Sequence, residues 1–383
     1  MLILFWCCAA LIAYVYFGYP LLLRAGLLGR RQPLQNGAIE PTISFIVPAH
    51  NEDTVIEDKI ANLLALEYPR ERIEILIGSD GSSDGTEEIV RRHAADGVGL
   101  ISFPQQLGKS AVQNGLVAAA SGEILVFTDA DCFLPPEALR RLIHNFSDSR
   151  VGLVTARPLY ENESATCITQ NESLYLRYES WLRREESDRG LLSMASGSLF
   201  AMRRALWRPL DANLGDDFVL PLEVLRAGYR NVLEPRAVAL TLLEQKQPAS
   251  MLRLKTRIIS KDFRGLLAHS DLLNPLRFGG ASVALWSHKL LRWLVPYFLL
   301  GLFAASILLA RAPFFRAALL LQCVLYALAL AGFLLRERFS GSRWTIPFSF
   351  CLVNLAALLG TIQCFAGRTS GQWKPVRKQS HAA

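Results

Sequence analysis

Pairs of aspartates stand at two places in the chain where they could act together on one ligand. Asp129 and Asp131 are two residues apart in the run TDADC, and Asp216 and Asp217 are adjacent in GDDF. Two hard carboxylates this close suit Mg²⁺ or Mn²⁺, which shares its coordination with waters and substrate phosphates. Adjacent carboxylates that face a pocket repel each other, which raises a proton affinity and favours a general base.

Each acidic site also has a structural interpretation. An Asp-x-Asp pair often only caps a turn, and Ser-Asp-Gly around Asp80 is strong turn chemistry. At the end of a buried strand, however, the Asp80 carboxylate can accept hydrogen bonds from a uracil or ribose edge. Asp216 and Asp217 precede a helix predicted over residues 218–227, whose dipole stabilises acids at its start. The two interpretations are compatible at this last site.

Short β-branched runs alternate with helical patterns upstream of these sites. Strands are predicted over residues 42–47, 73–77, 98–102 and 124–127, and helices over 53–66, 87–93 (capped by Thr86) and 110–120. Such alternation predicts an α/β domain with a parallel, doubly wound sheet whose ligand crevice lies at the strand carboxyl ends. The loops after the first, second and fourth strands therefore converge on one rim.

The composition is too apolar for an ordinary soluble enzyme. Of 383 residues 51% are hydrophobic, and the mean hydropathy is +0.24. Four uncharged stretches approach the ~20 residues that cross a bilayer core. We expect an anchor over 1–23, a linker over 24–40, an aqueous domain over 41–260, an interfacial, amphipathic linker over 261–292, three spans within 293–367 and a basic tail over 368–383.

The positions of the cations predict how the chain is oriented. Arg24, Arg30 and Arg31 follow the first apolar stretch, which favours a retained anchor with the aqueous domain in the cytoplasm. We therefore expect a multi-pass protein of the inner (plasma) membrane. Three further crossings would place the C-terminus outside, although the tail is basic. Either one C-terminal segment is interfacial or re-entrant, or the charge rule fails here.

Several classes of function are excluded. The net charge is +7, but the cations sit beside the apolar stretches and form no basic stripe with interleaved aromatics, so we expect no nucleic-acid partner. No CxxC or Cys/His spacing indicates a zinc site or a disulfide framework. No GxGxxG follows a predicted strand, which removes the main support for a dinucleotide oxidoreductase.

Seven motifs follow one another in a specific order, namely VPAHNE, SDGSSDGT, GKSAVQNG, TDADC, SGSLFAMRR, GDDFVLPLEVLRAGYR and KTRIISKDFRG. In this order they resemble the membrane-integrated family 2 glycosyltransferases, the group that contains cellulose, chitin, hyaluronan and poly-N-acetylglucosamine synthases. The resemblance implies a cytoplasmic, Rossmann-like GT-A domain joined to transmembrane helices. It also implies inverting transfer from a nucleotide sugar, expected to be a UDP-sugar, to a saccharide or lipid-linked acceptor in cell-surface polysaccharide synthesis.

The resemblance also implies a role for individual residues. The nucleotide sugar would be held by Pro48, Ala49, Asn51, Glu52, Asp80, Lys109, Asp129 and Arg257, the last at the diphosphate. Asp129 and Asp131 would hold Mg²⁺ or Mn²⁺. Gly197 and Ser198 would line the acceptor side, and Asp217 would be the catalytic base with Asp216 as the preceding acid.

Two positions depart from the family's Gln-x-x-Arg-Trp pattern. Leu254 replaces the glutamine and Ile258 the tryptophan, which in the synthases supports the acceptor sugar. Transfer of a single sugar to a lipid carrier or ceramide-like lipid is therefore an alternative to chain elongation. A non-catalytic membrane scaffold or transporter is the alternative from another class.

Overall fold

The computed structural model describes residues 1–35, 37–160, 167–241, 248–335 and 346–367. The chain divides into two compact units, which are described separately. The sheet unit comprises Leu34–Leu159 and Met194–Leu242, and the helical unit comprises Met1–Pro33, Tyr160–Ser193 and Leu243–Arg368. The basic tail expected over 368–383 lies outside the described residues.

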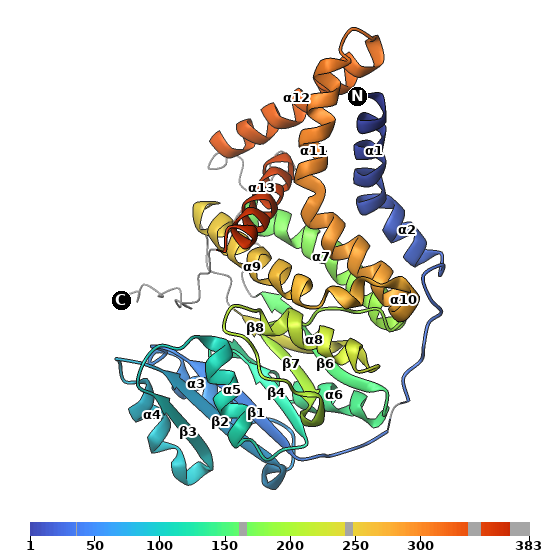
Figure 1. Cartoon of the computed structure of the whole chain (residues 1–383). Helices are drawn as coiled ribbons and strands as arrows, with labels where there is room; N and C mark the ends of the chain where they lie inside the picture. Colours follow the sequence, from blue (N-terminus) through green and yellow to red (C-terminus); the bar gives the residue numbers. More distant parts are fainter. Residues whose placement is uncertain (36, 161–166, 242–247, 336–345, 368–383) are drawn as a thin grey trace. The chain divides into compact units, whose positions relative to one another are not determined.

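The sheet unit is built on one mixed sheet (Figure 1). Its strands are β1 (Ile43–Ala49), β2 (Ile73–Asp80), β3 (Val98–Phe103), β4 (Ile124–Thr128), β5 (Cys132–Phe133), β6 (Val151–Tyr160), β7 (Leu199–Arg203) and β8 (Arg230–Thr241). Their order in the sheet is β3-β2-β1-β4-β7-β6-β8-β5. β1 pairs in parallel with β2 and β4, and β2 with β3. The parallel arrangement predicted for the first four strands is confirmed.

Beyond β4 the pairing changes direction. β7 runs antiparallel to both β4 and β6, and β5 runs antiparallel to β8. The sheet is thus parallel from β3 to β4 and antiparallel where β7 pairs with β4 and β6 and where β5 pairs with β8. This combination differs from a wholly parallel doubly wound sheet, and the sheet still presents the carboxyl ends of β1, β2 and β4 at one edge.

Helices cover both faces of this sheet. They are α3 (Ile56–Leu64), α4 (Thr86–Arg92), α5 (Lys109–Ala119), α6 (Ala138–His144) and α8 (Asp216–Arg226). Successive side chains of a strand point to opposite faces. Accordingly Phe45 and Val47 join the core that contains the buried residues of α3, whereas Ile46 joins the core that contains those of α5. The first strands are buried on both faces, which explains their continuous apolar runs.

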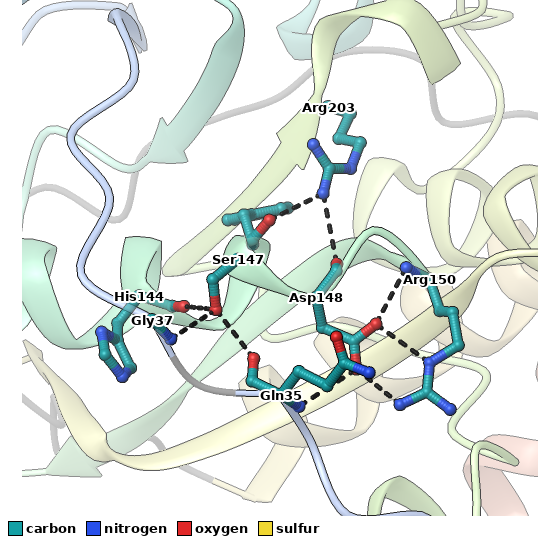
Figure 2. Close-up of polar contacts among 8 residues, drawn as sticks. Gln35, Gly37, His144, Ser147, Asp148, Arg150 and Arg203 are labelled. Carbon is teal, nitrogen blue, oxygen red and sulfur yellow. Dashed lines mark hydrogen bonds and ion pairs between the residues drawn. The ribbon is translucent and has the colours of Figure 1, made fainter.

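The segment before β1 is hydrogen-bonded to two residues, Ser147 and Asp148, that follow α6 (Figure 2). Gly37 donates its backbone N–H to Ser147 Oγ at 2.9 Å, and Gln35 donates to Asp148 Oδ2 at 3.3 Å. The buried Asp148 carboxylate also accepts hydrogen bonds from the Arg150 guanidinium, at 2.9 and 2.7 Å. One carboxylate thereby holds the incoming chain against the turn that leads to β6.

The helical unit contains long apolar helices. Its elements are α1 (Leu2–Ala13), a π-helical turn (Tyr14–Gly18), α2 (Tyr19–Arg24), α7 (Cys167–Asp188), α9 (Pro248–Ala268), α10 (Pro275–Ala284), a second π-helical turn (Leu285–Leu290), α11 (Leu291–Leu308), α12 (Pro313–Leu334) and α13 (Ile346–Phe365). Among the described residues, four stretches have the length and hydropathy to cross a membrane: Leu2–Arg24, Pro275–Leu308, Pro313–Leu334 and Ile346–Phe365.

Two helix boundaries in the helical unit differ from expectation. The amphipathic linker expected over 261–292 begins within α9, which stops at Ala268 before a 3₁₀ turn over Ser270–Leu273. The next candidate span starts at Pro275, upstream of the uncharged stretch that begins at residue 293. The hydropathy pattern places the start of the span after its cations. In the structure His288 pairs with two glutamates of α7, at 2.6 and 3.1 Å, and the helix continues through this position. Paired charges do not end a helix.

Candidate active site

The Asp80 carboxylate lies at the end of β2 and is 1% exposed. Its oxygens accept the backbone N–H groups of Leu107, at 2.6 Å, and Gly108, at 3.0 Å. Gly108 has φ +93°, which favours glycine, and α5 begins at the next residue. Asp80 therefore fixes the chain that leads into α5, while its expected contact with a nucleoside stays a prediction.

The loops after β1 and β2 are tied together, as the shared sheet edge predicts. Pro48 and Ala49 are the buried last residues of β1. Asn51 has a left-handed backbone, φ 55°, and its Oδ1 accepts the backbone N–H of Ser83 at 2.8 Å. Asn51 in turn donates its backbone N–H to Ser82 Oγ at 3.1 Å. The two loops form one rim on the carboxyl side of the sheet.

The role expected for Thr86 as a helix cap is wrong. The Asp84 Oδ1 atom accepts the Thr86 backbone N–H at 3.0 Å and its hydroxyl at 2.6 Å. The Thr86 hydroxyl oxygen accepts the backbone N–H of Glu52 at 2.8 Å. Asp84 thus satisfies the start of α4, and Thr86 links that helix to the loop after β1.

The Lys109 ammonium joins the two acidic sites. Its Nζ lies 2.9 Å from Asp129 Oδ1 and 3.3 Å from Asp216 Oδ2. Gln113, one turn further along α5, donates from Nε2 to Asp216 Oδ2 at 2.7 Å. The structure therefore brings together the end of β4, the first turn of α5 and the first turn of α8.

Burial and ion pairing oppose each other in this cluster. Burial alone would lower the pKa of Lys109, but the carboxylates of Asp129 and Asp216 raise it above its ordinary value. Burial raises the pKa of Asp129, and Lys109 opposes that rise. For Asp216 the burial effect is outweighed by Lys109 and by the Gln113 hydrogen bond, so its pKa is lowered. Asp216 is thus an ionised carboxylate, held by two side chains.

Asp217 and the residues expected on the acceptor side are neighbours. The backbone N–H of Ala195 donates to the Asp217 carbonyl at 2.7 Å. A Cβ added at Gly197 would lie 3.3 Å from Asp217 Oδ2, closer than ordinary van der Waals contact. Ser198 Oγ lies 2.8 Å from Ser196 Oγ. The segment before β7 therefore runs directly past the predicted catalytic carboxylate.

The Asp129 and Asp131 side chains suit a hard divalent cation. Asp131 is exposed, and the side chain of Asp129 is 33% exposed. No group of three or more His, Cys, Asp or Glu residues that could hold a metal occurs in the part of the chain that the structure describes. The protein would supply two carboxylates, leaving other positions to waters and phosphate oxygens, as Mg²⁺ favours. The Lys109 ammonium lies 2.9 Å from Asp129 Oδ1, so this carboxylate already stabilises a positive charge.

Two residues of the site were missed by the sequence analysis. Gln113 lies within the GKSAVQNG motif, four residues after Lys109 and so on the same helix face. Lys59 donates from Nζ to Thr128 Oγ1 at 2.9 Å and to the carbonyl of Cys132. Its position three residues after Ile56 places it on the apolar stripe of α3, and a lysine there is the signal that could have identified it.

Arg257 belongs to α9 in the helical unit, whereas the other predicted site residues belong to the sheet unit. On the same helix Leu254 is half-buried and Ile258 is 43% exposed. The contact of Arg257 with a diphosphate stays a prediction.

Part of the chain matches a known protein family. Residues 44–209 match the family model "Glycosyl transferase family 2". The chain is 28% identical over 209 residues to "Probable glycosyltransferase YdaM" of Bacillus subtilis, covering 52% of this chain and 50% of that protein. It is 27% identical over 211 residues to "Poly-beta-1,6-N-acetyl-D-glucosamine synthase" of Staphylococcus aureus, covering 53% and 50%. The chain thus spans about half the length of these curated relatives.

A solved structure resembles the chain over nearly its whole length. It is "Mannosyltransferase PcManGT from Pyrobaculum calidifontis in complex with GDP-Man and Mn2+", with a TM-score of 0.71 and 24% identity, covering 95% of this chain and 99% of that chain. This likeness confirms the expected fold class, a GT-A domain accompanied by apolar helices.

Proposed function

We propose that this chain, whose residues 44–209 match the family 2 glycosyltransferase model, is a glycosyltransferase that moves a sugar from a nucleotide sugar to a saccharide or lipid-linked acceptor. The resemblance of its motifs favours a UDP-sugar donor and a role in cell-surface polysaccharide synthesis. Among the described residues, four apolar stretches support a multi-pass membrane protein. The cations that follow the first stretch favour the inner (plasma) membrane with the sheet unit in the cytoplasm. The match to an enzyme family model favours this activity over a non-catalytic scaffold or transporter.

One observation carries the assignment of the site. Lys109 lies within ion-pair distance of both Asp129 and Asp216, which come from separate motifs. The carboxylate proposed to hold the cation is therefore adjacent to the acidic pair proposed to act on the acceptor. Sugar transfer requires this adjacency, because the donor phosphate and the attacking hydroxyl meet at one anomeric carbon.

In the proposed reaction each residue has a separate task. Asp129 and Asp131 hold Mg²⁺ or Mn²⁺, which when bound neutralises charge on the diphosphate. Asp217 accepts the proton of the acceptor hydroxyl. The oxygen of that hydroxyl bonds to the anomeric carbon while the bond from this carbon to the diphosphate breaks. A single displacement inverts the anomeric configuration. Asp216, ion-paired with Lys109 and hydrogen-bonded to Gln113, orients the first turn of α8.

The donor sits against the rim in this proposal. The end of β1, with Pro48 and Ala49, the following loop, with Asn51 and Glu52, and the end of β2 form the nucleoside side of the site. The resemblance of the motifs also assigns the diphosphate to Arg257 of α9, because a planar guanidinium suits phosphate oxygens. The acceptor approaches past Gly197 and Ser198, and the short approach of Gly197 to the Asp217 carboxylate supports this side.

The Asp217→Asn variant tests the base. An amide keeps the shape of the side chain but cannot take up the proton, so transfer should fall by about 100- to 10,000-fold with donor binding nearly unchanged. Transfer is followed with a radiolabelled UDP-sugar, and UDP binding by calorimetry on the full-length protein. Asp211→Asn, at an exposed aspartate of the preceding loop, is the matched control. Near-normal turnover in Asp217→Asn would remove this residue from the mechanism.

A second candidate activity is the transfer of one sugar to a lipid carrier or ceramide-like lipid. It is favoured by Leu254 and Ile258, which replace the glutamine and tryptophan that the synthases carry around the diphosphate-contacting arginine. The same catalytic residues would serve both activities, so only the length of the product separates them.

A further inference from the structure

Lys59 is a charged residue in the core of the sheet unit. It is 0% exposed, as are Ile56, Ile60 and Leu63 on the same helix. Burying an ammonium group is costly unless it is well hydrogen-bonded, and a hydrophobic side chain would fill this position at lower cost. A lysine at this position therefore indicates a function that requires a long side chain able to donate hydrogen bonds.

The contacts of Lys59 indicate that task. Its Nζ donates to the hydroxyl of Thr128, at 2.9 Å, and to the carbonyl of Cys132. These two acceptors bracket the residues Asp129, Ala130 and Asp131. One ammonium group thus bridges the two ends of the turn that carries both carboxylates.

The same helix holds the chain just beyond this turn. Asn62, three residues after Lys59, donates from Nδ2 to the Leu134 carbonyl at 2.8 Å and accepts the Leu134 N–H at 2.9 Å. Residues three apart share a helix face. α3 therefore presents two polar side chains to the backbone and hydroxyl groups of residues 128–134, within a face that is otherwise apolar.

We propose that Lys59 is a positioning residue for the cation site, holding Thr128 and Cys132 so that Asp129 and Asp131 address a single divalent ion. This inference rests on the proposed function, because it assigns a supporting residue to the same site. Lys59 is fully buried, so it acts through the turn and touches neither donor nor acceptor. Groups behind metal ligands commonly change metal affinity by 10- to 100-fold.

Two variants of the full-length protein test the proposal. Lys59→Met keeps the length of the side chain and removes both hydrogen bonds, and Thr128→Val removes one of them. Ile60→Val, at the adjacent buried residue of α3, is the control for a general loosening of the helix. The first readout is the Kd of Mn²⁺ in the presence of UDP, measured by calorimetry. The second is hydrogen–deuterium exchange of residues 128–134.

The expected result is a Kd for Mn²⁺ about tenfold or more higher in Lys59→Met, a smaller rise in Thr128→Val and no rise in Ile60→Val. Exchange over residues 128–134 should quicken in the same order. Unchanged Mn²⁺ affinity in a folded Lys59→Met protein overturns the proposal, as does an equal loss in Ile60→Val. Should Lys59→Met not fold, Thr128→Val decides by the same criteria.

The two readouts separate this inference from the proposed function. If the wild-type protein binds no Mn²⁺ with UDP, the assignment of the cation site fails. Faster exchange of residues 128–134 in Lys59→Met, but not in Ile60→Val, would then still show that the Lys59 hydrogen bonds stabilise the turn. Equal exchange in the wild type and Lys59→Met would overturn that hold as well.

Discussion

Lys109 is the residue around which the candidate site is assembled. Its ammonium group pairs with Asp129 and Asp216, and the two carboxylates keep its pKa above the ordinary value of a lysine. A divalent cation at Asp129 would compete with Lys109 for the same carboxylate oxygen. Lys109 would then be available to the donor phosphates, so one residue can serve the site both before and after the donor binds.

The approach of Gly197 to the carboxylate of Asp217, the proposed base, gives a prediction at this scale. In Gly197→Ala the new methyl group would lie 3.3 Å from Asp217 Oδ2 and displace it by a few tenths of an ångström. Misplacement of a reacting group by about 1 Å can cost about 100-fold in rate, so we expect a loss of transfer of about tenfold. The measurement is kcat with a saturating donor, alongside the Kd of UDP.

Gly197→Ala should leave UDP binding within about twofold of the wild type, because we propose that the glycine lies on the acceptor side. A tenfold loss of kcat is about 1.4 kcal/mol. Gly85→Ala is a useful comparison, since a Cβ there would meet Asp53 at an ordinary 3.6 Å. Equal kcat values for Gly197→Ala and the wild type would argue against close contact between this segment and Asp217 in the active enzyme.

Sequence reasoning succeeds for residues whose place follows from sheet topology. The loops that contain Asn51 and Asp80 meet because parallel strands bring their carboxyl ends to one edge. It fails for Lys59 and Thr86, whose hydrogen-bond partners depend on how helices pack on the sheet. Thr86 has the residue type of a cap, and only the geometry assigns that task to Asp84 instead.

At the scale of elements, the first four strands and the helices between them were predicted within a few residues. The sequence signal there is local, because each strand is a β-branched run and each helix has apolar residues at helical spacing. The antiparallel pairings of β7 with β4 and β6 could not be predicted in this way. The chain between β6 and β7 contains α7, and no local pattern specifies the direction in which the chain returns to the sheet.

The attachment of the segment before β1 leads to a prediction about stability. The Arg150 hydrogen bonds, followed by backbone N–H donors from Arg150 and Gln35, hold the pKa of Asp148 well below its usual range. In Asp148→Asn the arginine loses its carboxylate, and we expect a loss of about 1–3 kcal/mol of stability at pH 7. Thermal unfolding of the full-length protein in detergent measures the loss.

The pH dependence of this loss follows from the sign of the shift. A depressed pKa stabilises the folded state above the ordinary pKa of an aspartate, about 3.9, and this contribution disappears as pH falls towards the folded-state value. The stability difference between the wild type and Asp148→Asn should therefore be constant from about pH 7 to pH 5 and shrink below about pH 4. A difference that is the same at pH 3.5 and pH 7 would show that the ionised carboxylate is not its source.

At the scale of the whole molecule, apolar helices and a catalytic domain occur in one chain. The expected spans were found from hydropathy, but the start of Pro275–Leu308 was not. There Arg292 donates to Glu179 at 2.9 Å, and His288 pairs with the same glutamate. These partners lie more than one hundred positions away in the sequence, so a hydropathy profile counts the charges without their neutralising contacts.

The length of the product distinguishes the two candidate activities of the whole protein. Ile258 stands where the synthases carry the tryptophan that supports the acceptor sugar. The single-transfer candidate predicts one labelled sugar per lipid-extractable product, whereas polysaccharide synthesis predicts a ladder of products. The combined Leu254→Gln and Ile258→Trp variant should add sugars if these positions limit elongation, whereas Arg253→Gln, an exposed neighbour on α9, should not. Products made with a radiolabelled UDP-sugar are separated by size. A polymer ladder from the wild-type protein would show that elongation proceeds without the tryptophan, and the single-transfer alternative would then be rejected.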